Sequence, residues 1–457
     1  MTFARFFRLA ERGTSVKTEI LGGVTTFATM AYIIVVNPAI LAFAGIPRGP
    51  STVATILAAV FGCLAMGLYA NLPIAVAPYM GENAFVAFGL AALGISWQQR
   101  LGAVFVSGLG FAVITLLKVR SWLARAISAS LKHAFAVGIG LFLAFIGLYE
   151  TGVVTSFVAG MPAAALTGAA GTLENPDVPV KIGNLRDPRT LLAVAGFLLV
   201  AILLSRRVRG AILIGIGAVA AAGIALGYAS APRAVVAWPG PEVAGLSEIA
   251  GKLDVAGVLR LSFLPVLLTL FLMSFLDTLG TLVGVGAAGD MLDRDGNFPE
   301  IEKPMMVDAA ACVASSLLGT STSGAFIESA AGIREGARTG LASVTTAALF
   351  AGSLFFLPLV RPLQELRFAY GPALVAVGLL MTASAAKIDY GDFTEVVPAF
   401  TAIAVMIFTY NVANGLTASL VVHPVLKFGA GRAREVHAGG WVLAGMCLVY
   451  FIFGIPH

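Results

Sequence analysis

Long apolar runs recur along almost the whole chain of 457 residues, and the stretch from Phe135 to Tyr149 is one example. A helix needs about 20 apolar residues to cross the hydrocarbon core, so a dozen or more spans fit and a large soluble domain does not. Only 12% of the residues are charged, about half the share found in soluble domains. Because the apolar residues are continuous instead of alternating, a transmembrane β-barrel is excluded as well. We therefore expect an all-α polytopic membrane protein.

Basic residues gather in short stretches between the apolar runs. The positive-inside rule places such stretches in the cytoplasm, so we expect a multi-pass protein of the cell (inner or plasma) membrane with a cytoplasmic N-terminus. Residues 1–18 hold no apolar core long enough for a cleavable signal, so the first span should be retained. This topology also accounts for the net charge of +5 without a nucleic-acid partner. The stretches contain Arg5, Arg8, Arg12 and Lys17; Lys118, Arg120, Arg125 and Lys132; and Arg206, Arg207 and Arg209.

The apolar segments fall into two sets, separated by a polar stretch at 229–258. Seven spans is an odd number, so a second copy would enter the membrane from the opposite face and be inverted. We thus expect a first repeat over 1–235 and a second repeat over 236–457. Near the end of the chain, 395–428 fits either one broken span or two short spans, which leaves the side of the C-terminus open.

Two segments at the same ordinal place in each half cannot be continuous helices. Leu72–Phe85 has two prolines and a glycine inside a candidate span, and Gly319–Glu328 is a polar run bounded by glycines. The pairs Ala84-Phe85 and Ala325-Phe326 recur at matching places, which supports a repeat. Paired broken segments are the best sequence pointer to a transporter binding site. The alternative is a pair of kinked helices with a purely structural role.

Four acidic residues stand alone in otherwise uncharged segments: Glu82, Asp277, Asp308 and Glu328. Each would cost about 2.5 to 3.5 kcal/mol at the centre of a lipid-facing helix, so we expect them to face a hydrated, protected space. Neutral carboxyl groups that join helices by hydrogen bonds are the alternative.

The same carboxyl groups indicate a chemistry. No intramembrane Lys or Arg is available to pair with them, and desolvation together with like-charge proximity favours their protonated forms. They can therefore load and release protons. A carboxylate also accepts N–H donors, and main-chain N–H groups at the broken helices can donate to carbonyls. The ligand should be small, planar, polar and largely neutral. The three cysteines lack metal-ligand spacing, so we expect no metal and no cofactor.

Three stretches closely resemble the AzgA-like purine permeases of the nucleobase:cation symporter-2 group: Glu19–Pro38, Asp277–Gly284 and Glu328–Gly340. The resemblance extends over nearly the whole chain. It implies the uracil-permease fold, which has 14 spans in two inverted seven-helix repeats and short strands in the broken spans 3 and 10. The core domain would cover 19–117 and 259–358, and the gate domain 133–228 and 371–457. The hydrophobic segment after Gly440 is not accounted for by 14 spans.

By this resemblance, the protein imports guanine, hypoxanthine, adenine or xanthine by proton symport, with an elevator-like alternating-access mechanism. Many relatives read Ala-Pro-Gly-Met-Gly-Leu-Asn-Ala-Phe. This chain has Tyr79 in place of the first Gly and Glu82 in place of the Leu, which leaves the preferred purine open. The expected substrate-binding residues are Asp277, Glu328, Thr322, Ser323, Ala84 and Phe85. The expected proton-coupling residues are Asp277, Asp308 and Glu82.

Other functions fit the sequence less well. An anion exchanger on the same fold is the nearest alternative, because half-helix N-termini favour anions, but unpaired carboxylates would repel an anion. A channel lacks a filter motif, and a membrane enzyme lacks an assembled nucleophile and base. The expected partners are a purine, protons and the lipid bilayer, and a homodimer is left open.

Overall fold

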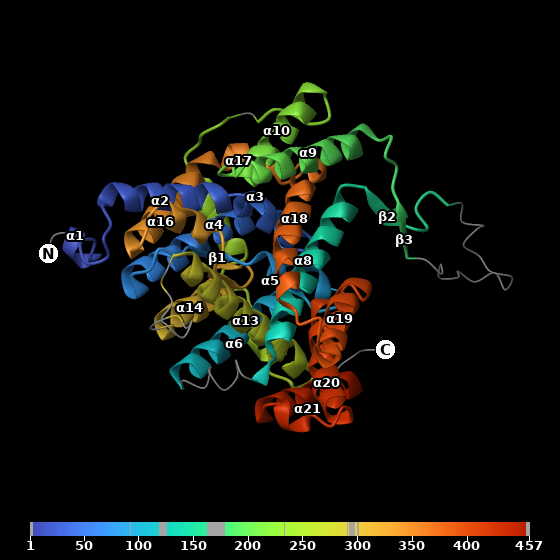
Figure 1. Ribbon diagram of the computed structural model, residues 1–457. Helices are drawn as coiled ribbons and strands as arrows, with labels where there is room; N and C mark the ends of the chain where they lie inside the picture. The colour runs from blue at the N-terminus through green and yellow to red at the C-terminus, as the bar shows by residue number, and fades with distance from the viewer. Residues whose placement is uncertain are drawn as a thin grey trace.

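The computed structural model describes residues 3–91, 93–117, 126–161, 179–232, 234–289, 291, 298 and 301–453. These residues form an almost entirely helical protein (Figure 1). The basic residues Lys118, Arg120 and Arg125 lie outside the described residues. Within the described part, eight helical segments are long and apolar enough to cross a membrane: Val16–Ala44, Arg48–Ala70, Trp97–Leu116, Ala129–Glu150, Pro188–Ser205, Val266–Gly286, Gly340–Leu363 and Arg367–Lys387. The polytopic helical fold expected from the sequence is confirmed.

In the first half, short 3-10 or π-helical turns, labelled η, interrupt several of the helices. The elements are α1 (Phe3–Phe6), α2 (Val16–Met30), α3 (Ile33–Leu41), η1 (Ala42–Ala44), α4 (Arg48–Ala65), η2 (Met66–Ala70), β1 (Val76–Pro78), α5 (Met80–Ala84), η3 (Phe85–Gly89), α6 (Trp97–Leu116), α8 (Ala129–Glu150), β2 (Val154–Ser156), β3 (Val180–Ile182), α9 (Pro188–Ser205) and α10 (Ala211–Ala225).

The second half of the chain begins after a connection of short helical turns. Its elements are α11 (Gly240–Ala244), η5 (Gly245–Glu248), α12 (Val255–Val258), η6 (Leu261–Phe263), α13 (Leu264–Ala288), α14 (Glu302–Leu318), β4 (Ser323–Ala325), α15 (Ser329–Arg334), α16 (Gly340–Ser353), η7 (Leu354–Phe356), α17 (Leu357–Leu363), α18 (Arg367–Met381), η8 (Thr382–Lys387), α19 (Phe393–Phe408), α20 (Val412–Gly429), η9 (Ala433–Glu435) and α21 (Ala438–Phe453).

The two broken segments meet each other at the centre of the molecule (Figure 1). Strands β1 and β4 pair antiparallel, with Val76 opposite Ala325 and Pro78 opposite Ser323. The pair is extended by hydrogen bonds from the Tyr79 N–H to the Thr322 carbonyl and from the Phe326 N–H to the Ala75 carbonyl, both 2.9 Å. Proline cannot continue a helix and donates no ladder hydrogen bond, so Pro78 fits a strand end. The short strands predicted for the two broken segments are therefore present.

The segment 395–428 consists of two helices, α19 and α20, and not of one broken span. The chain reverses between them at Tyr410, whose φ of 51° is left-handed, and Asn411 caps α20 by accepting the Ala413 N–H at 2.9 Å. The segment after Gly440 forms the further helix α21, which packs on α20 through Trp441 and Phe428.

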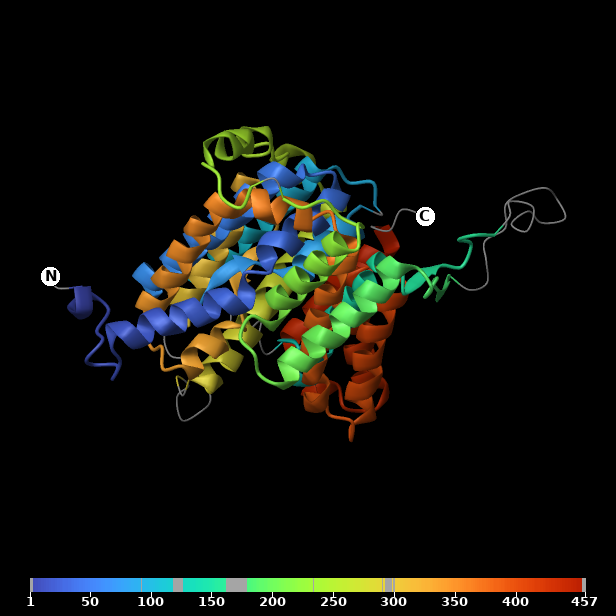
Figure 2. The same ribbon diagram turned by 90° about the horizontal axis from the view of Figure 1, so that it is seen from above.

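Helices pack closely within two groups. In one group, α2 lies against α15 and α16, with Gly22 facing Gly332. In the other, α8 lies against α18, with Gly140 facing Gly378. Small residues let helix backbones approach closely inside a membrane. Viewed from above, the red helices α19 to α21 gather on one side with green α9, whereas blue α2 and orange α16 lie on the other side (Figure 2).

Candidate functional site

The paired strands bring all four isolated carboxyl groups into one region. Glu82 lies on α5 directly after β1, and Glu328 lies between β4 and α15. Asp277 and Asp308 come from the neighbouring helices α13 and α14. Asp277 is an electrostatic neighbour of the other three carboxyl groups. Among the described residues, no Lys or Arg forms a hydrogen bond or ion pair with any of the four.

Asp308 is fully buried and joins three elements. Its Oδ2 accepts hydrogen bonds from the Thr278 hydroxyl at 2.8 Å, the Ala325 N–H at 2.9 Å and, at 3.4 Å, the Tyr79 hydroxyl. Its Oδ1 is also buried but has no hydrogen-bond partner among the described residues. One oxygen of Asp308 thus positions the strand pair against α13, and the other remains available.

Asp277 and Glu328 differ from the other two acids because they are only half-buried. The Glu328 Oε1 accepts the Tyr32 hydroxyl at 2.9 Å from the start of α3, whereas Asp277 has no hydrogen-bond partner among the described residues. The accessible carboxyl pair of the site is therefore Asp277 and Glu328, with Tyr32 fixing one of them.

Glu82 has an exposed fraction of only 1%, and neither of its carboxyl oxygens has a hydrogen-bond partner among the described residues. Polar atoms of Asn83, Ser274 and Thr322 are likewise buried without a partner in the described part. A buried, unsatisfied polar group costs about 1 to 3 kcal/mol, and more when it is charged. Such a cluster is typical of a site that binds a polar ligand or protons.

Tyr79 fills the space beside the strands. Its ring is stacked on Phe326, with centroids 6.2 Å apart and planes within 8°, and its hydroxyl lies 3.0 Å from the Thr278 hydroxyl. The ring lies directly over Gly324, so a Cβ at that position would overlap the phenol. The bulky phenol of Tyr79 is therefore accommodated by a glycine on the opposite strand.

The remaining predicted residues lie close to the strand pair but differ in orientation. The Ser323 hydroxyl is bound to the Ser315 hydroxyl of α14 at 2.6 Å, so it is directed toward that helix. The buried Thr322 hydroxyl has no hydrogen-bond partner in the described part of the chain. Ala84 and Phe85 are fully buried in the half-helix after β1.

Sequence reasoning missed three polar residues at this site. Tyr32 stands in an apolar run, and Thr278 and Ser274 lie on the helix that carries Asp277. A lone hydroxyl in an apolar helix gives no signal, because it can bond its own helix backbone. The spacing from Asp277 was the available clue for Ser274, which lies three residues before it and so on the same side of the helix. Thr278 follows Asp277 directly, and an adjacent position gives no such signal.

Known proteins resemble this chain over most of its length. The sequence profile of a family described as Permease family matches residues 17–418. The adenine permease AdeP of Escherichia coli is 36% identical over 99% of this chain and 96% of its own length. The guanine/hypoxanthine permease PbuO of Bacillus subtilis is 36% identical over 94% of this chain and 96% of its own length. Among solved structures, the transmembrane domain of the cyanobacterial bicarbonate transporter BicA aligns with a TM-score of 0.61 and 16% identity, covering 88% of this chain and 97% of that one.

Proposed function

Since this chain belongs to the nucleobase:cation symporter-2 family of membrane transporters, we propose that it imports purine nucleobases by proton symport. The chain is a permease and not an enzyme. The proposal concerns the substrate, the coupling ion and the movement that carries the substrate across.

The main support for this proposal is the group of four carboxyl groups around the β1–β4 pair. None of these carboxyl groups has a Lys or Arg partner among the described residues. Relatives named adenine permease and guanine/hypoxanthine permease share 36% of their residues with this chain. A purine carries ring N–H donors, which carboxylates accept. We assign this role to Asp277 and Glu328, because they are the half-buried pair.

The surroundings of this pair suit a flat ring. Tyr79 and Phe326 present parallel aromatic planes close to the acids, and aromatic faces favour stacking with planar ligands. The Thr322 hydroxyl, which has no partner among the described residues, adds a group that can donate to a ring acceptor. Thr322, Ser323, Ala84 and Phe85 complete the proposed substrate-binding set.

Proton coupling is proposed for Asp277, Asp308 and Glu82, which are close enough to influence one another's charge. Like charges in a buried site cannot all ionise, so a proton is held by the group. Uptake should rise as the external pH falls from 8 to 6, because protonation precedes substrate binding. The measurement is initial uptake of labelled purine at several external pH values. Accumulation that survives a protonophore but requires sodium would contradict proton coupling.

For the transport movement, we propose that a core domain (19–117 and 259–358) slides against a gate domain (133–228 and 371–457). The two sets touch through an aromatic cluster. Phe88, from the proposed core, packs on Tyr410 at 5.8 Å, and Tyr410 in turn packs on Phe142 of α8 at 5.2 Å. With the N-terminus in the cytoplasm, this cluster would lie toward the outer face. An elevator-like movement of the core domain against the gate domain would separate Phe88 from Tyr410.

Uptake of labelled adenine, guanine, hypoxanthine and xanthine into cells that express the protein tests the proposed function. We expect competition by unlabelled purines and no competition by sulfate or bicarbonate. The fold of BicA makes the anions a necessary control. Carboxylates at the site would repel an anion, so bicarbonate should not compete with the labelled purine. Inhibition of uptake by bicarbonate and not by unlabelled purines would overturn the proposal.

Glu82→Leu should change the ranking of competing purines while folding is preserved. The resemblance implies leucine at this position, and leucine removes two buried oxygens that have no partner in the described structure. If Glu82 accepts a ligand N–H, the selectivity at stake is about 5- to 150-fold. Competition by four unlabelled purines, measured in wild type and variant, checks this. An unchanged ranking and an unchanged pH dependence would assign Glu82 a structural role only.

A further inference from the structure

Two arginines occupy matching places in the two halves of the chain. Each follows one of the short half-helices that leave the β1–β4 pair, and each donates hydrogen bonds back to carbonyl groups at the end of that half-helix. Arg100 lies in the first turn of α6 and follows the half-helix 80–89, which consists of α5 and η3. Arg338 lies in the turn before α16 and follows the half-helix α15. Each arginine thus joins a half-helix to the helix after it.

Arg100 binds three main-chain carbonyl groups. Its Nη1 donates to the carbonyls of Val86 and Ala87, both at 3.2 Å, and its Nε donates to the Ile95 carbonyl at 2.7 Å. Val86 and Ala87 are among the last four residues of η3, and the last carbonyl groups of a helix have no partner within that helix. The guanidinium therefore caps the C-terminal end of the half-helix 80–89 and holds it against α6.

Arg100 stands where local rules disfavour an arginine. Its exposed fraction is 6%, and a charged side chain buried in a membrane protein is costly. A helix dipole favours anions at the N-terminus and cations at the C-terminus, so Arg100 gains nothing from the first turn of its own helix. It gains instead from the C-terminal end of η3. Residues that break local rules tend to lie at functional sites, so a role beyond joining two helices is indicated.

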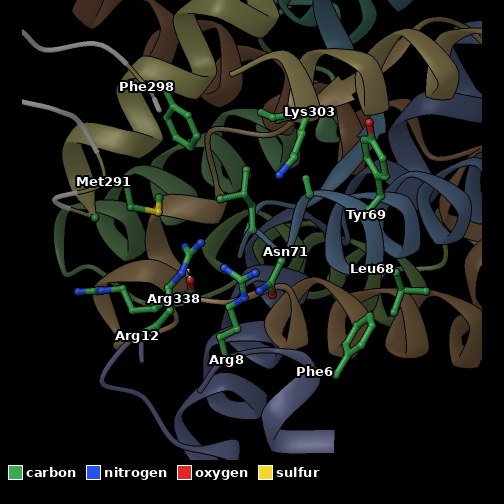
Figure 3. Close-up of a pocket in the computed structure, with 14 residues that line it drawn as sticks. Phe6, Arg8, Arg12, Leu68, Tyr69, Asn71, Met291, Phe298, Lys303 and Arg338 are labelled. Atoms are coloured by element: carbon green, nitrogen blue, oxygen red, sulfur yellow. Dashed lines mark hydrogen bonds between the residues drawn. The ribbon is translucent and has the colours of Figure 1, made fainter. Parts of the chain in front are cut away.

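Arg338 makes the corresponding contacts in the second half. Its Nη1 donates to the carbonyl of Ile333, in the last turn of α15, at 2.7 Å and to the Ala337 carbonyl at 2.8 Å. Its main chain is held as well, because the buried Glu19 accepts the Arg338 N–H at 2.7 Å. Arg12 donates to the Arg338 carbonyl at 3.4 Å, and Figure 3 shows these two arginines next to each other in the wall of a cavity. Both the main chain and the side chain of Arg338 are therefore fixed.

The opposite end of each half-helix lies at the candidate site. Glu82 is the third residue of α5, and Glu328 immediately precedes α15. The start of α5 is tied to the strand pair by the hydrogen bond from the Tyr79 N–H to the Thr322 carbonyl. A binding site needs its groups held within about 0.5 Å of the productive geometry. Because a half-helix moves as a short rod, a tilt at its far end displaces the acid at its near end.

We propose that Arg100 and Arg338 are positioning residues, which place Glu82 and Glu328 for the ligand by holding the C-terminal ends of their half-helices. Neither arginine touches the ligand in this assignment. The inference rests on the proposed purine transport for the identity of the ligand, and on main-chain hydrogen bonds for the holding of the half-helices. A lysine cannot fully replace either arginine, because an ammonium group is a point charge, whereas the guanidinium fork reaches several carbonyls at once.

The test compares purified full-length variants with wild type by amide hydrogen exchange and by binding of a labelled purine. The purine is whichever of adenine, guanine, hypoxanthine and xanthine the wild type binds most tightly. Arg100→Met keeps a long side chain and removes its donors. We expect faster exchange of the amides in 80–89 and a loss of purine affinity of about 5- to 150-fold, because ligand groups lose well-placed partners. Arg338→Met should have the same two effects, with faster exchange in Ser329–Arg334.

Arg189→Met is the matched control. Arg189 also lies in the first turn of a helix, α9, but its side chain lies over the ring of Tyr228 and not at a half-helix. Exchange in 80–89 and purine affinity should both keep their wild-type values. Arg100→Lys provides a second measurement if methionine prevents folding. It should speed exchange in 80–89 and lower affinity by about 2- to 12-fold, the equivalent of one lost hydrogen bond.

The proposal requires both changes in the same folded variant. Wild-type affinity in Arg100→Met and Arg338→Met, or in Arg100→Lys where only that variant folds, would overturn it whatever the exchange rates are. Reduced affinity with wild-type exchange would overturn it too, because the arginine would then act on the ligand by another route. If the wild type binds none of the four purines, the proposed function fails, whereas unchanged exchange in the variants would contradict the holding of the half-helices independently.

Discussion

Asp277→Asn and Glu328→Gln are each expected to lower purine affinity by on the order of 100-fold and to abolish measurable uptake. An amide of the same size presents an NH2 donor where the carboxylate has an acceptor, so it confronts a ligand N–H with a second donor. It also removes a group that can carry a proton. Binding of labelled purine to purified protein, measured beside uptake, separates loss of the ligand contact from loss of coupling.

Tyr32→Phe is the matched control for Glu328→Gln. It keeps the carboxylate and removes only the hydrogen bond that the Tyr32 hydroxyl donates to Glu328. A loss of about 2- to 12-fold is expected, because a hydrogen bond contributes about 0.5 to 1.5 kcal/mol. If an amide variant binds purine as tightly as wild type, that acid does not contact the ligand.

Gly324→Ala is expected to remove nearly all transport, although it adds a single methyl group. The new Cβ would overlap the ring and hydroxyl of Tyr79, which is packed between β4, Thr278 and Asp308. Overpacking costs about 1 to 3 kcal/mol, and here the shift would move the strand that carries the binding site. Uptake and the amount of folded protein in the membrane are the two measurements.

The double variant Tyr79→Ala/Gly324→Ala distinguishes this collision from a general intolerance of side chains on β4. Tyr79→Ala removes the ring but keeps the main-chain hydrogen bond from residue 79 to the Thr322 carbonyl. Transport by the double variant should return to the level of Tyr79→Ala alone, since residues in contact behave non-additively. If the double variant is as inactive as Gly324→Ala, the overlap with Tyr79 is not the cause.

The fold was largely predictable because a bilayer allows few structures. The apolar run Phe135–Tyr149 became α8, and prolines and glycines located both broken segments. The short strands themselves followed from the resemblance and not from the local pattern, because a three-residue strand has no periodicity to read. Their antiparallel pairing was not predicted. The segment 395–428 stayed ambiguous, since length alone did not reveal the left-handed turn at Tyr410.

In the candidate site, the charged residues were the ones that the residues themselves predicted, whereas Thr322, Ser323, Ala84 and Phe85 followed from the resemblance. An isolated acid is conspicuous in an apolar sequence, so Glu82, Asp277, Asp308 and Glu328 stood out, and the structure places them together. Their different surroundings could not be read in advance. Whether a carboxylate receives three donors, as one oxygen of Asp308 does, depends on helix rotation and on contacts between distant parts of the chain.

The pairing of β1 with β4 also dictates the order in which the protein can be completed during synthesis. The two strands are separated by roughly 250 residues, and ribosomes add about 5 to 20 residues per second. Val76–Pro78 must therefore wait for tens of seconds with polar backbone groups that have no strand partner, in a medium that offers no water to satisfy them. The first half of the chain thus stays incomplete until β4 has been inserted. The candidate site around this pair can therefore be completed only after β4 has been inserted, and a chain truncated before residue 323 would carry β1 without its partner strand.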